Sequence, residues 1–287
     1  MEEAIIADQL TYAYDQLTAV DHIDFKVKEG EILSFLGPNG AGKTTTVKML
    51  TGQLRPKEGK AVLLGMDVVQ ETERVQARIG VCFELTNLYE QMSAEENLNL
   101  FAKLFGVKDF DAGALLVRVG LDGRGKDRVE TYSKGMKQRL MVARSLVNQP
   151  RILFLDEPTE GLDPVSSETI RNVILEERER GATVFLTTHD MVEADKLSDR
   201  VAFIDQGGIT ALDTPHNLKQ QYGKRAIKAE VVRADGGLET KEIILDKPKT
   251  AEAIQELFTQ EQVVTIHSEE ATLEDIFIRI TGRGLAG

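Results

Sequence analysis

Residues 37–44, G-P-N-G-A-G-K-T, have the residue types and spacing of a phosphate-binding loop. They fit the pattern G-x-x-x-x-G-K-[ST], between an apolar run at 32–36 that predicts a strand and a helical pattern at 43–50. Glycines let the backbone curl so that N–H groups point at phosphate oxygens, and the helix N-terminus adds partial positive charge. Lys43 can then reach the β- and γ-phosphates, while the Thr44 hydroxyl can ligate Mg²⁺. The expected nucleotide contacts are Gly37, Pro38, Asn39, Gly40, Ala41, Gly42, Lys43, Thr44 and Thr45.

Two carboxylates follow a second apolar run, I-L-F-L-D-E at residues 152–157. A buried parallel strand delivers the residues after it to the carboxyl edge of its sheet, where ligands of α/β folds bind. Asp156 is expected to hold the Mg²⁺ shell, and Glu157 to orient or deprotonate the attacking water. A strand followed by an acidic turn is the structural alternative. Beside the phosphate-binding loop the functional interpretation is favoured, and the two motifs together predict binding and hydrolysis of ATP.

A second anion site is indicated by Y-S-K-G-M-K-Q-R at residues 132–139. Ser133 and Gly135 would offer a hydroxyl, free backbone N–H groups and the start of a helix, all of which bind anions. A simple helix N-cap at Ser133 is the alternative, and it would be preferred if the segment stood alone. Two anion sites in one chain make sense if each serves the nucleotide of a different copy.

The elements that must position these residues are short, apolar and partly β-branched strands separated by helices. This alternation predicts an α/β fold of the P-loop NTPase type around a partly parallel sheet. The expected strands are 32–36, 61–64, 79–83, 152–155, 183–186 and 201–204.

The alternation is interrupted between about residues 85 and 150, where the pattern is helical at 94–105, 111–119 and 135–147. We interpret this interval as a helical subdomain inserted between two strands. After residue 222 the composition changes, and strands at 226–232, 240–245 and 263–267 with helices at 250–258 and 273–280 predict a small α+β domain. The expected domains are therefore 1–222 and 223–287.

Composition limits the classes of partner and the compartment. The net charge of −12 and the sequence pI of about 5.0 argue against a large nucleic-acid-binding surface. Cys82 is the only cysteine, which excludes an intrachain disulfide and is interpreted as a buried core thiol. No run approaches the roughly 18 apolar residues of a spanning helix, and the acidic N-terminus lacks a signal pattern. We expect a cytoplasmic protein.

With these motifs in order, residues 1–222 resemble the nucleotide-binding subunit of an ATP-binding cassette (ABC) transporter. In that family two subunits pack head to tail, so the resemblance implies that Ser133 and Gly135 contact the γ-phosphate held by the other subunit. The form Y-S-x-G-M-x-Q-R is similar to that of exporters of drugs, lipids and polysaccharides. The resemblance thus implies a partner cassette, identical or homologous, a separate permease, and a position on the inner face of the cell membrane.

Further roles are implied by the resemblance alone. Tyr14 matches the position of an aromatic residue that stacks on adenine, with Tyr12 as a competing candidate. His189, in T-T-H-D, matches the switch histidine that contacts the γ-phosphate and the Glu157 region. Residues 160–163 match the loop that crosses the dimer interface, although Asp163 can equally cap the next helix.

Glu84 departs from the family pattern, which usually has glutamine at this position. A carboxylate can still accept a hydrogen bond from water and approach Mg²⁺, so Glu84 is expected to act both in catalysis and as a metal ligand. In the helical interval, Leu88, Tyr89 and Met92 are candidate contacts to the permease, with ordinary packing as the alternative.

Two other functions fit the phosphate-binding loop less well. Soluble ABC ATPases that act on nucleic acid typically carry two cassettes, coiled-coil insertions or cysteine-rich modules, and this chain has one cassette and one cysteine. A P-loop kinase would leave the segment at 132–139 and His189 without a role. We therefore predict a transport ATPase that does not bind nucleic acid, with a soluble ABC ATPase as the alternative.

Overall fold

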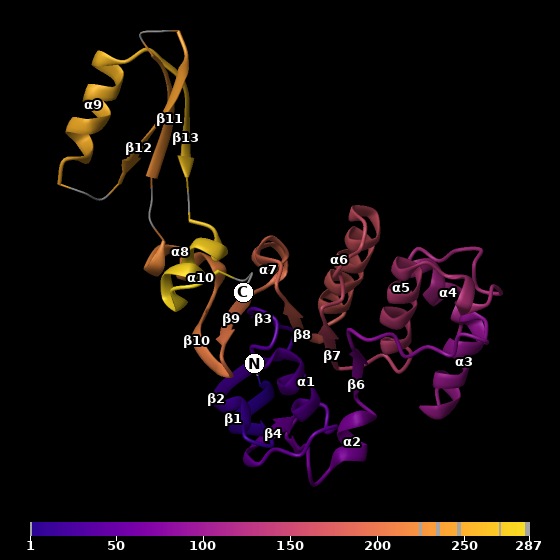
Figure 1. Ribbon diagram of the computed structural model, residues 1–287. Helices are drawn as coiled ribbons and strands as arrows, with labels where there is room; N and C mark the ends of the chain where they lie inside the picture. The colour runs from indigo at the N-terminus through magenta and orange to yellow at the C-terminus, as the bar shows by residue number, and fades with distance from the viewer. Residues whose placement is uncertain (1, 224–225, 234–235, 246–247, 270, 285–287) are drawn as a thin grey trace. The chain divides into compact units, whose positions relative to one another are not determined.

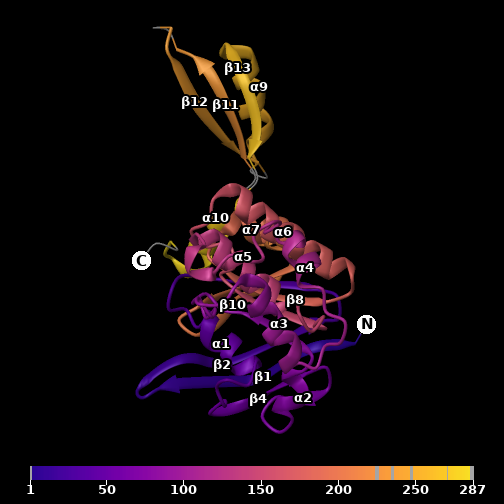
Figure 2. The same cartoon turned by 90° about the vertical axis from the view of Figure 1, so that its right-hand side faces the viewer.

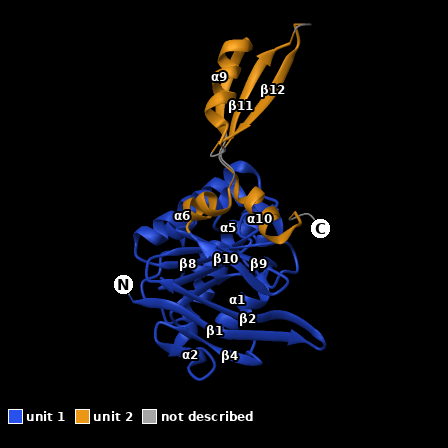
Figure 3. Ribbon diagram, turned by 90° about the vertical axis from the view of Figure 1, so that its left-hand side faces the viewer, with its two compact units in different colours: residues 1–213 blue, residues 214–287 orange. Residues whose placement is uncertain are grey.

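The computed structural model describes residues 2–223, 226–233, 236–245, 248–269 and 271–284 (Figure 1). The chain divides into two compact units, Met1–Asp213 and Thr214–Gly287, coloured separately in Figure 3. The candidate chemistry lies in the first unit. The division falls before the helix α8 (Pro215–Tyr222), whereas the sequence pattern places a boundary after it.

A six-stranded sheet forms the centre of the first unit, in the order β10-β9-β3-β8-β7-β6. All but β10 run parallel, because helices connect them, and β10 pairs antiparallel with β9. The predicted strands of this sheet are found with small changes at their ends: β3 (Ile32–Leu36), β6 (Ile79–Cys82), β7 (Ile152–Asp156), β8 (Thr183–Thr188) and β9 (Arg200–Asp205), followed by β10 (Gly208–Asp213). Helix α1 (Lys43–Leu50) has the predicted bounds.

A second, antiparallel sheet covers one face of the central sheet, in the order β2-β1-β4-β5. Its strands are β1 (Glu3–Tyr14), β2 (Leu17–Lys28), β4 (Glu58–Leu63) and β5 (Met66–Asp67). The strand predicted at 61–64 therefore pairs with β1 and not with the parallel sheet. Every second side chain of β2 from Ile23 is buried, and Phe25 packs on Phe35 of β3 with ring centroids 5.0 Å apart. Ala19 of β2 lies beside Gly42, so the β1–β2 hairpin borders the phosphate-binding loop.

The inserted subdomain is helical, as predicted, and Figures 1 and 2 show its helices grouped at one end of the first unit. They are α3 (Ala94–Leu104), α4 (Ala112–Arg118) and α5 (Lys134–Ser145), with a short 3₁₀ turn at Val129–Thr131. Ser93 begins α3 with a capping box, and Asp111 and Ser133 cap α4 and α5. Cys82 is buried where α5 meets β6, and burial raises the pKa of its thiol to about 12.

Three further helices complete the first unit: α2 (Thr72–Gln76), α6 (Pro164–Glu179) and α7 (Met191–Leu197). In the second unit a three-stranded antiparallel sheet has the order β12-β11-β13. Its elements are α8, β11 (Ala226–Val232), β12 (Leu238–Ile244), α9 (Thr250–Gln260), β13 (Val263–Glu269) and α10 (Leu273–Thr281). Arg279 of α10 donates to the Tyr222 carbonyl at 2.6 Å, which joins α10 to the end of α8.

Candidate functional site

The phosphate-binding loop lies between β3 and α1 and needs glycine at two crowded positions. A Cβ on Gly37 would come within 2.1 Å of the Ile204 carbonyl oxygen. Gly42 has a φ of +109°, and a Cβ there would approach the Ala19 carbonyl oxygen to 2.5 Å. The loop borders a hollow of about 220 Å³, lined by Ala19, Pro38, Asn39, Gly40, Gly42, Lys43, Thr44, Thr45, Glu84 and Glu157. Most predicted loop residues therefore line one cavity.

Lys43 is the cation of this cavity and is only 6% exposed. Its ammonium group donates to the Gly37 carbonyl at 2.6 Å and lies 3.0 Å from Glu157 Oε1. These contacts join the loop to the end of β7. A phosphate bound in the hollow would compete with the Glu157 carboxylate for the same ammonium group.

Asp156 ends β7 and is completely buried. One carboxylate oxygen, Oδ1, accepts from the Thr187 hydroxyl. Burial raises the pKa of Asp156, against the lowering effect of the nearby Thr187 and Thr44 hydroxyls. Among the described residues, the other oxygen, Oδ2, has no hydrogen-bond partner. A buried oxygen without a partner beside a threonine hydroxyl fits a Mg²⁺ site.

Glu157 has left-handed backbone geometry, with a φ of +49°, which is uncommon for a residue with a side chain. Its N–H donates to the Thr187 carbonyl at 3.1 Å, so this strained conformation is held by the neighbouring strand β8. Oε2 accepts from His189 Nδ1 at 2.9 Å, while Oε1 faces Lys43. The carboxylate is thus held between a lysine and a half-exposed histidine at the edge of the hollow.

Glu84 lines the same hollow, two residues after the end of β6. Its pKa is raised by burial and by the carboxylates of Glu160, Asp156 and Glu157, and lowered by Lys43. Four carboxylates therefore gather near one lysine. The structure brings the three predicted catalytic residues, Glu157, His189 and Glu84, to one edge of the sheet.

We expect Glu84→Gln to keep ATPase activity within about tenfold of the unchanged protein, because either side chain offers an oxygen to water or Mg²⁺. Steady-state phosphate release by the purified protein measures this. A collapse of turnover with ATP binding intact would show that the negative charge of Glu84 is required.

Ser133 and Gly135 do not line this hollow. The exposed Ser133 caps α5 by accepting from the Met136 N–H at 3.3 Å, so the N-cap alternative holds within one chain. Gly135 faces the start of α6, where an added Cβ would lie 3.1 Å from Ser166 Oγ and 3.6 Å from Asp163 Oδ2. Asp163 caps α6 through Ser166. The start of α5, at Lys134 and Gly135, thus lies beside the loop 160–163.

Tyr14 ends β1 and is 43% exposed, and it meets Tyr12 edge to face with ring centroids 4.9 Å apart. Neither tyrosine lines the hollow; the hairpin residue that does is Ala19. Adenine stacking on Tyr14 stays a prediction. The sequence pattern does not point to Ala19 or Thr187 as site residues, although Thr187 belongs to the T-T-H-D motif and carries a hydroxyl at the end of a strand.

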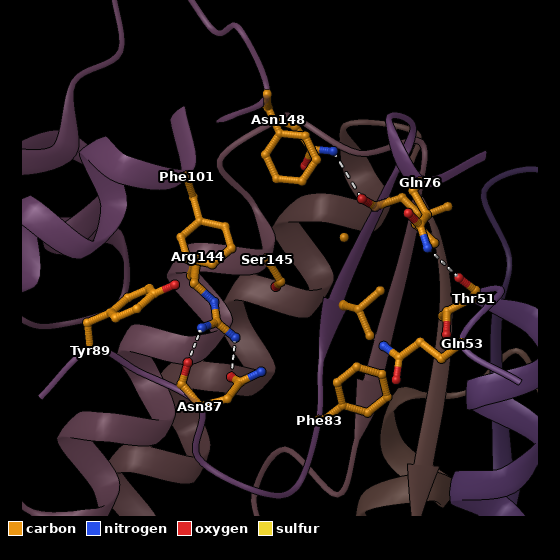
Figure 4. Close-up of a pocket in the computed structure, with 14 residues that line it drawn as sticks. Thr51, Gln53, Gln76, Phe83, Asn87, Tyr89, Phe101, Arg144, Ser145 and Asn148 are labelled. Atoms are coloured by element: carbon orange, nitrogen blue, oxygen red, sulfur yellow. Dashed lines mark hydrogen bonds between the residues drawn. The ribbon is translucent and has the colours of Figure 1, made fainter. Parts of the chain in front are cut away.

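A second hollow, of about 400 Å³, lies between β6 and helices α3 and α5 (Figure 4). Aromatic and amide side chains line it, and Arg144 is the only charged one among its fourteen residues. The Arg144 guanidinium stacks on the Phe101 ring at 4.7 Å and donates to the Asn87 carbonyl at 2.7 Å. We call this hollow the helical-subdomain groove. Its residues are Thr51, Gln53, Gln76, Ile79, Gly80, Val81, Phe83, Asn87, Tyr89, Phe101, Phe105, Arg144, Ser145 and Asn148.

Comparison with known proteins agrees with this geometry. Residues 20–160 match the family described as ABC transporter. The chain is 45% identical over 285 residues to the fluoroquinolones export ATP-binding protein of Mycobacterium tuberculosis strain H37Rv, and the match covers 99% of this chain and 95% of that protein. This chain belongs to the ABC transporter family. A bacitracin transport ATP-binding protein of Bacillus licheniformis is 32% identical, over 100% of both chains.

Solved structures support the same assignment of the cassette. An ATP-binding subunit of an ABC transporter is 28% identical, with a TM-score of 0.71 over 76% of this chain and 93% of that one. A dimeric cassette in a post-hydrolysis state with ADP and Pi is 25% identical, with a TM-score of 0.68 over 73% and 98%. The predicted family and fold are confirmed.

The cassette binds and hydrolyses ATP and is the ATPase subunit of an exporter-type ABC transporter that drives a separate permease. Among the residues that the structure describes, none of the helices is long and apolar enough to cross a membrane.

Proposed function

We propose that the cassette holds ATP and Mg²⁺ in one half of a site and that a second cassette, identical or homologous, supplies the other half. The observation that carries this proposal is the position of Ser133 and Gly135. They lie outside the hollow, on a surface shared with Gly161 and Asp163, where a Cβ on Gly161 would come within 2.7 Å of Lys134 Nζ. Head-to-tail pairing would bring this surface onto the partner's phosphate-binding loop.

Within the hollow, each residue has a role that its contacts support. Mg²⁺ would neutralise charge on the phosphates, held by the Thr44 hydroxyl, the free oxygen of Asp156 and Glu84. Lys43 would leave Glu157 for the phosphates. Glu157, released from Lys43 and still held by His189, would orient the attacking water and accept its proton. Outside the hollow, at the end of β1, Tyr14 is proposed to stack on the adenine.

The helical-subdomain groove is the proposed contact with the permease. Its aromatic residues, Phe83, Phe101, Phe105 and half-exposed Tyr89, offer apolar surface, and the amides offer hydrogen bonds to a short segment. Of the three predicted contact residues, only Tyr89 lines it, while Leu88 packs against the core of the helical subdomain. We propose a cassette at the inner face of the membrane that powers export of an antibiotic-like compound, as the names of its relatives suggest.

Gentle detergent extraction and capture of the tagged cassette tests this proposal. We expect a polytopic membrane protein to co-purify, and recovery of soluble partners or ribosomes alone would contradict the transport function.

We expect Tyr89→Ala to reduce recovery of that membrane protein several-fold, because it removes an aromatic contact from the groove while the Tyr89 backbone bonds to Asn97 remain. The matched control is Leu104→Ala, which removes a 70% exposed side chain of α3 outside the groove and should leave recovery unchanged. Quantitative blotting of the captured material measures both. Equal recovery with the two variants would place the permease contact elsewhere.

A further inference from the structure

Glu193 is a buried carboxylate that the proposed ATP chemistry does not use. It lies on α7 and is 2% exposed. Its Oε2 accepts from the Thr159 hydroxyl at 2.7 Å and from the Thr188 hydroxyl at 3.3 Å. Its other oxygen, Oε1, is buried without a hydrogen-bond partner among the described residues.

Burying this carboxyl group is costly, and α7 does not need it as a cap. Burial raises its pKa, and the hydroxyls of Thr159 and Thr188 partly oppose that effect. The helix is already capped by Asp190, which accepts from the N–H groups of Val192 and Glu193. An apolar side chain would fill the same space at lower cost, so the contacts of Glu193 are its distinguishing feature.

The two threonines belong to different parts of the site. Thr159 lies in the loop that starts at Glu157 and ends at Asp163, on the surface proposed to face the partner cassette. Thr188 immediately precedes His189, whose ring bonds to Glu157 at 2.9 Å. One carboxyl group therefore joins the interface loop to the histidine segment.

We infer that Glu193 is a positioning residue that couples the interface loop, through Thr159, to the placement of His189 and Glu157. The inference rests on the proposed two-cassette function. When a partner moves the loop, Thr159 moves with it, and Glu193 carries that displacement to Thr188 and the adjacent histidine. Glu193 itself touches neither nucleotide nor water in this scheme.

Removing the Thr159 hydroxyl with the near-isosteric Thr159→Val tests the coupling without a large change of volume. We expect kcat to fall roughly tenfold, with KM for ATP within about twofold. The melting temperature should fall by only a few degrees, because the Thr188 hydroxyl still donates to the Glu193 carboxylate. Thr159→Ser should restore kcat, because it restores the hydroxyl. Thr169→Val is the matched control. Among the described residues the Thr169 hydroxyl bonds only to the Val165 carbonyl of its own helix, so its loss should leave kcat unchanged.

A double-mutant cycle separates coupling from independent effects. Glu193→Gln keeps one acceptor oxygen and should retain most of the activity, whereas Glu193→Ala should match Thr159→Val. Thr159→Val combined with Glu193→Ala should be no slower than either alone. Unchanged kcat in Thr159→Val, or effects that multiply, would overturn the inference. Failure of the two-cassette function would be seen differently, as a wild-type cassette that stays monomeric by light scattering and still hydrolyses ATP at its full rate.

Discussion

Glu157→Gln is expected to lower ATP turnover at least about a hundredfold while leaving ATP binding intact. Loss of a positioned general base typically costs a factor of this size or more. Glutamine keeps the shape of the side chain and one oxygen for His189, but it cannot accept a proton from water. It also cannot hold Lys43 by charge, so the lysine is freer to bind phosphate.

Because ATP then stays bound, the two-cassette proposal expects a stable dimer of Glu157→Gln in the presence of ATP and Mg²⁺. Light scattering measures the mass, and phosphate release measures the residual turnover. Glu168→Gln serves as control, since in the part of the chain that the structure describes this exposed carboxylate pairs only with Arg171 on α6. Retained turnover in Glu157→Gln would remove Glu157 from its proposed role, and a monomer under all conditions would count against the dimer.

Lys43→Ala is expected to weaken ATP binding at least about a hundredfold, which corresponds to roughly 2.7 kcal/mol. The lysine is the only cation among the described residues that line the hollow, and its removal also leaves the buried Glu157 carboxylate without its ion pair. Loss of the cation removes an attraction for phosphate, and the unpaired carboxylate repels it. Titration with a fluorescent ATP analogue measures the affinity.

Lys48→Ala is the matched control for this substitution, because Lys48 lies on the same helix but outside the hollow. Its affinity should equal that of the unchanged cassette. Tight ATP binding by Lys43→Ala would show that the backbone of the loop alone holds the phosphates.

The central sheet and the phosphate-binding loop can be predicted from the sequence, because the apolar runs and the loop motif indicate the same strand-loop-helix arrangement. Residues 32–36 are apolar at almost every position, since the strand is buried on both faces, and the glycines and lysine that follow mark the loop. The sequence pattern does not indicate the β1–β2 hairpin, and it groups the strand at 61–64 with the central strands, whereas this strand pairs with β1. Periodicity reports which face of a strand is buried, not which strand pairs with it.

At the candidate site, the sequence predicts which residue types take part, but not which of them contact one another. The position of the Asp156 and Glu157 carboxylates at the edge of the sheet is predictable from the apolar strand that precedes them. The positive φ of Glu157, its bond to His189 and the role of Thr187 depend on β8, which is distant in sequence. Nothing in the sequence pattern distinguishes Glu193 from an ordinary charged residue of a short helix. The completion of the site by Ser133 depends on a second chain, so it remains a proposal.

A mixture of two inactive variants tests that proposal most directly. Lys43→Ala disables the half-site around the phosphate-binding loop. Ser133→Asp keeps a side chain that caps α5 well but places a negative charge where the partner's γ-phosphate should lie. Each variant alone is expected to be inactive.

If the site is shared, a mixed dimer contains one fully intact site, formed by the loop of the Ser133→Asp chain and the Ser133 of the Lys43→Ala chain. Equal mixing should then restore up to about a quarter of wild-type turnover, since half of randomly formed dimers are mixed and each has one of two sites intact. The test applies under conditions in which Glu157→Gln forms its ATP-dependent dimer. A mixture as inactive as its two components would contradict a site completed by Ser133 of the second cassette.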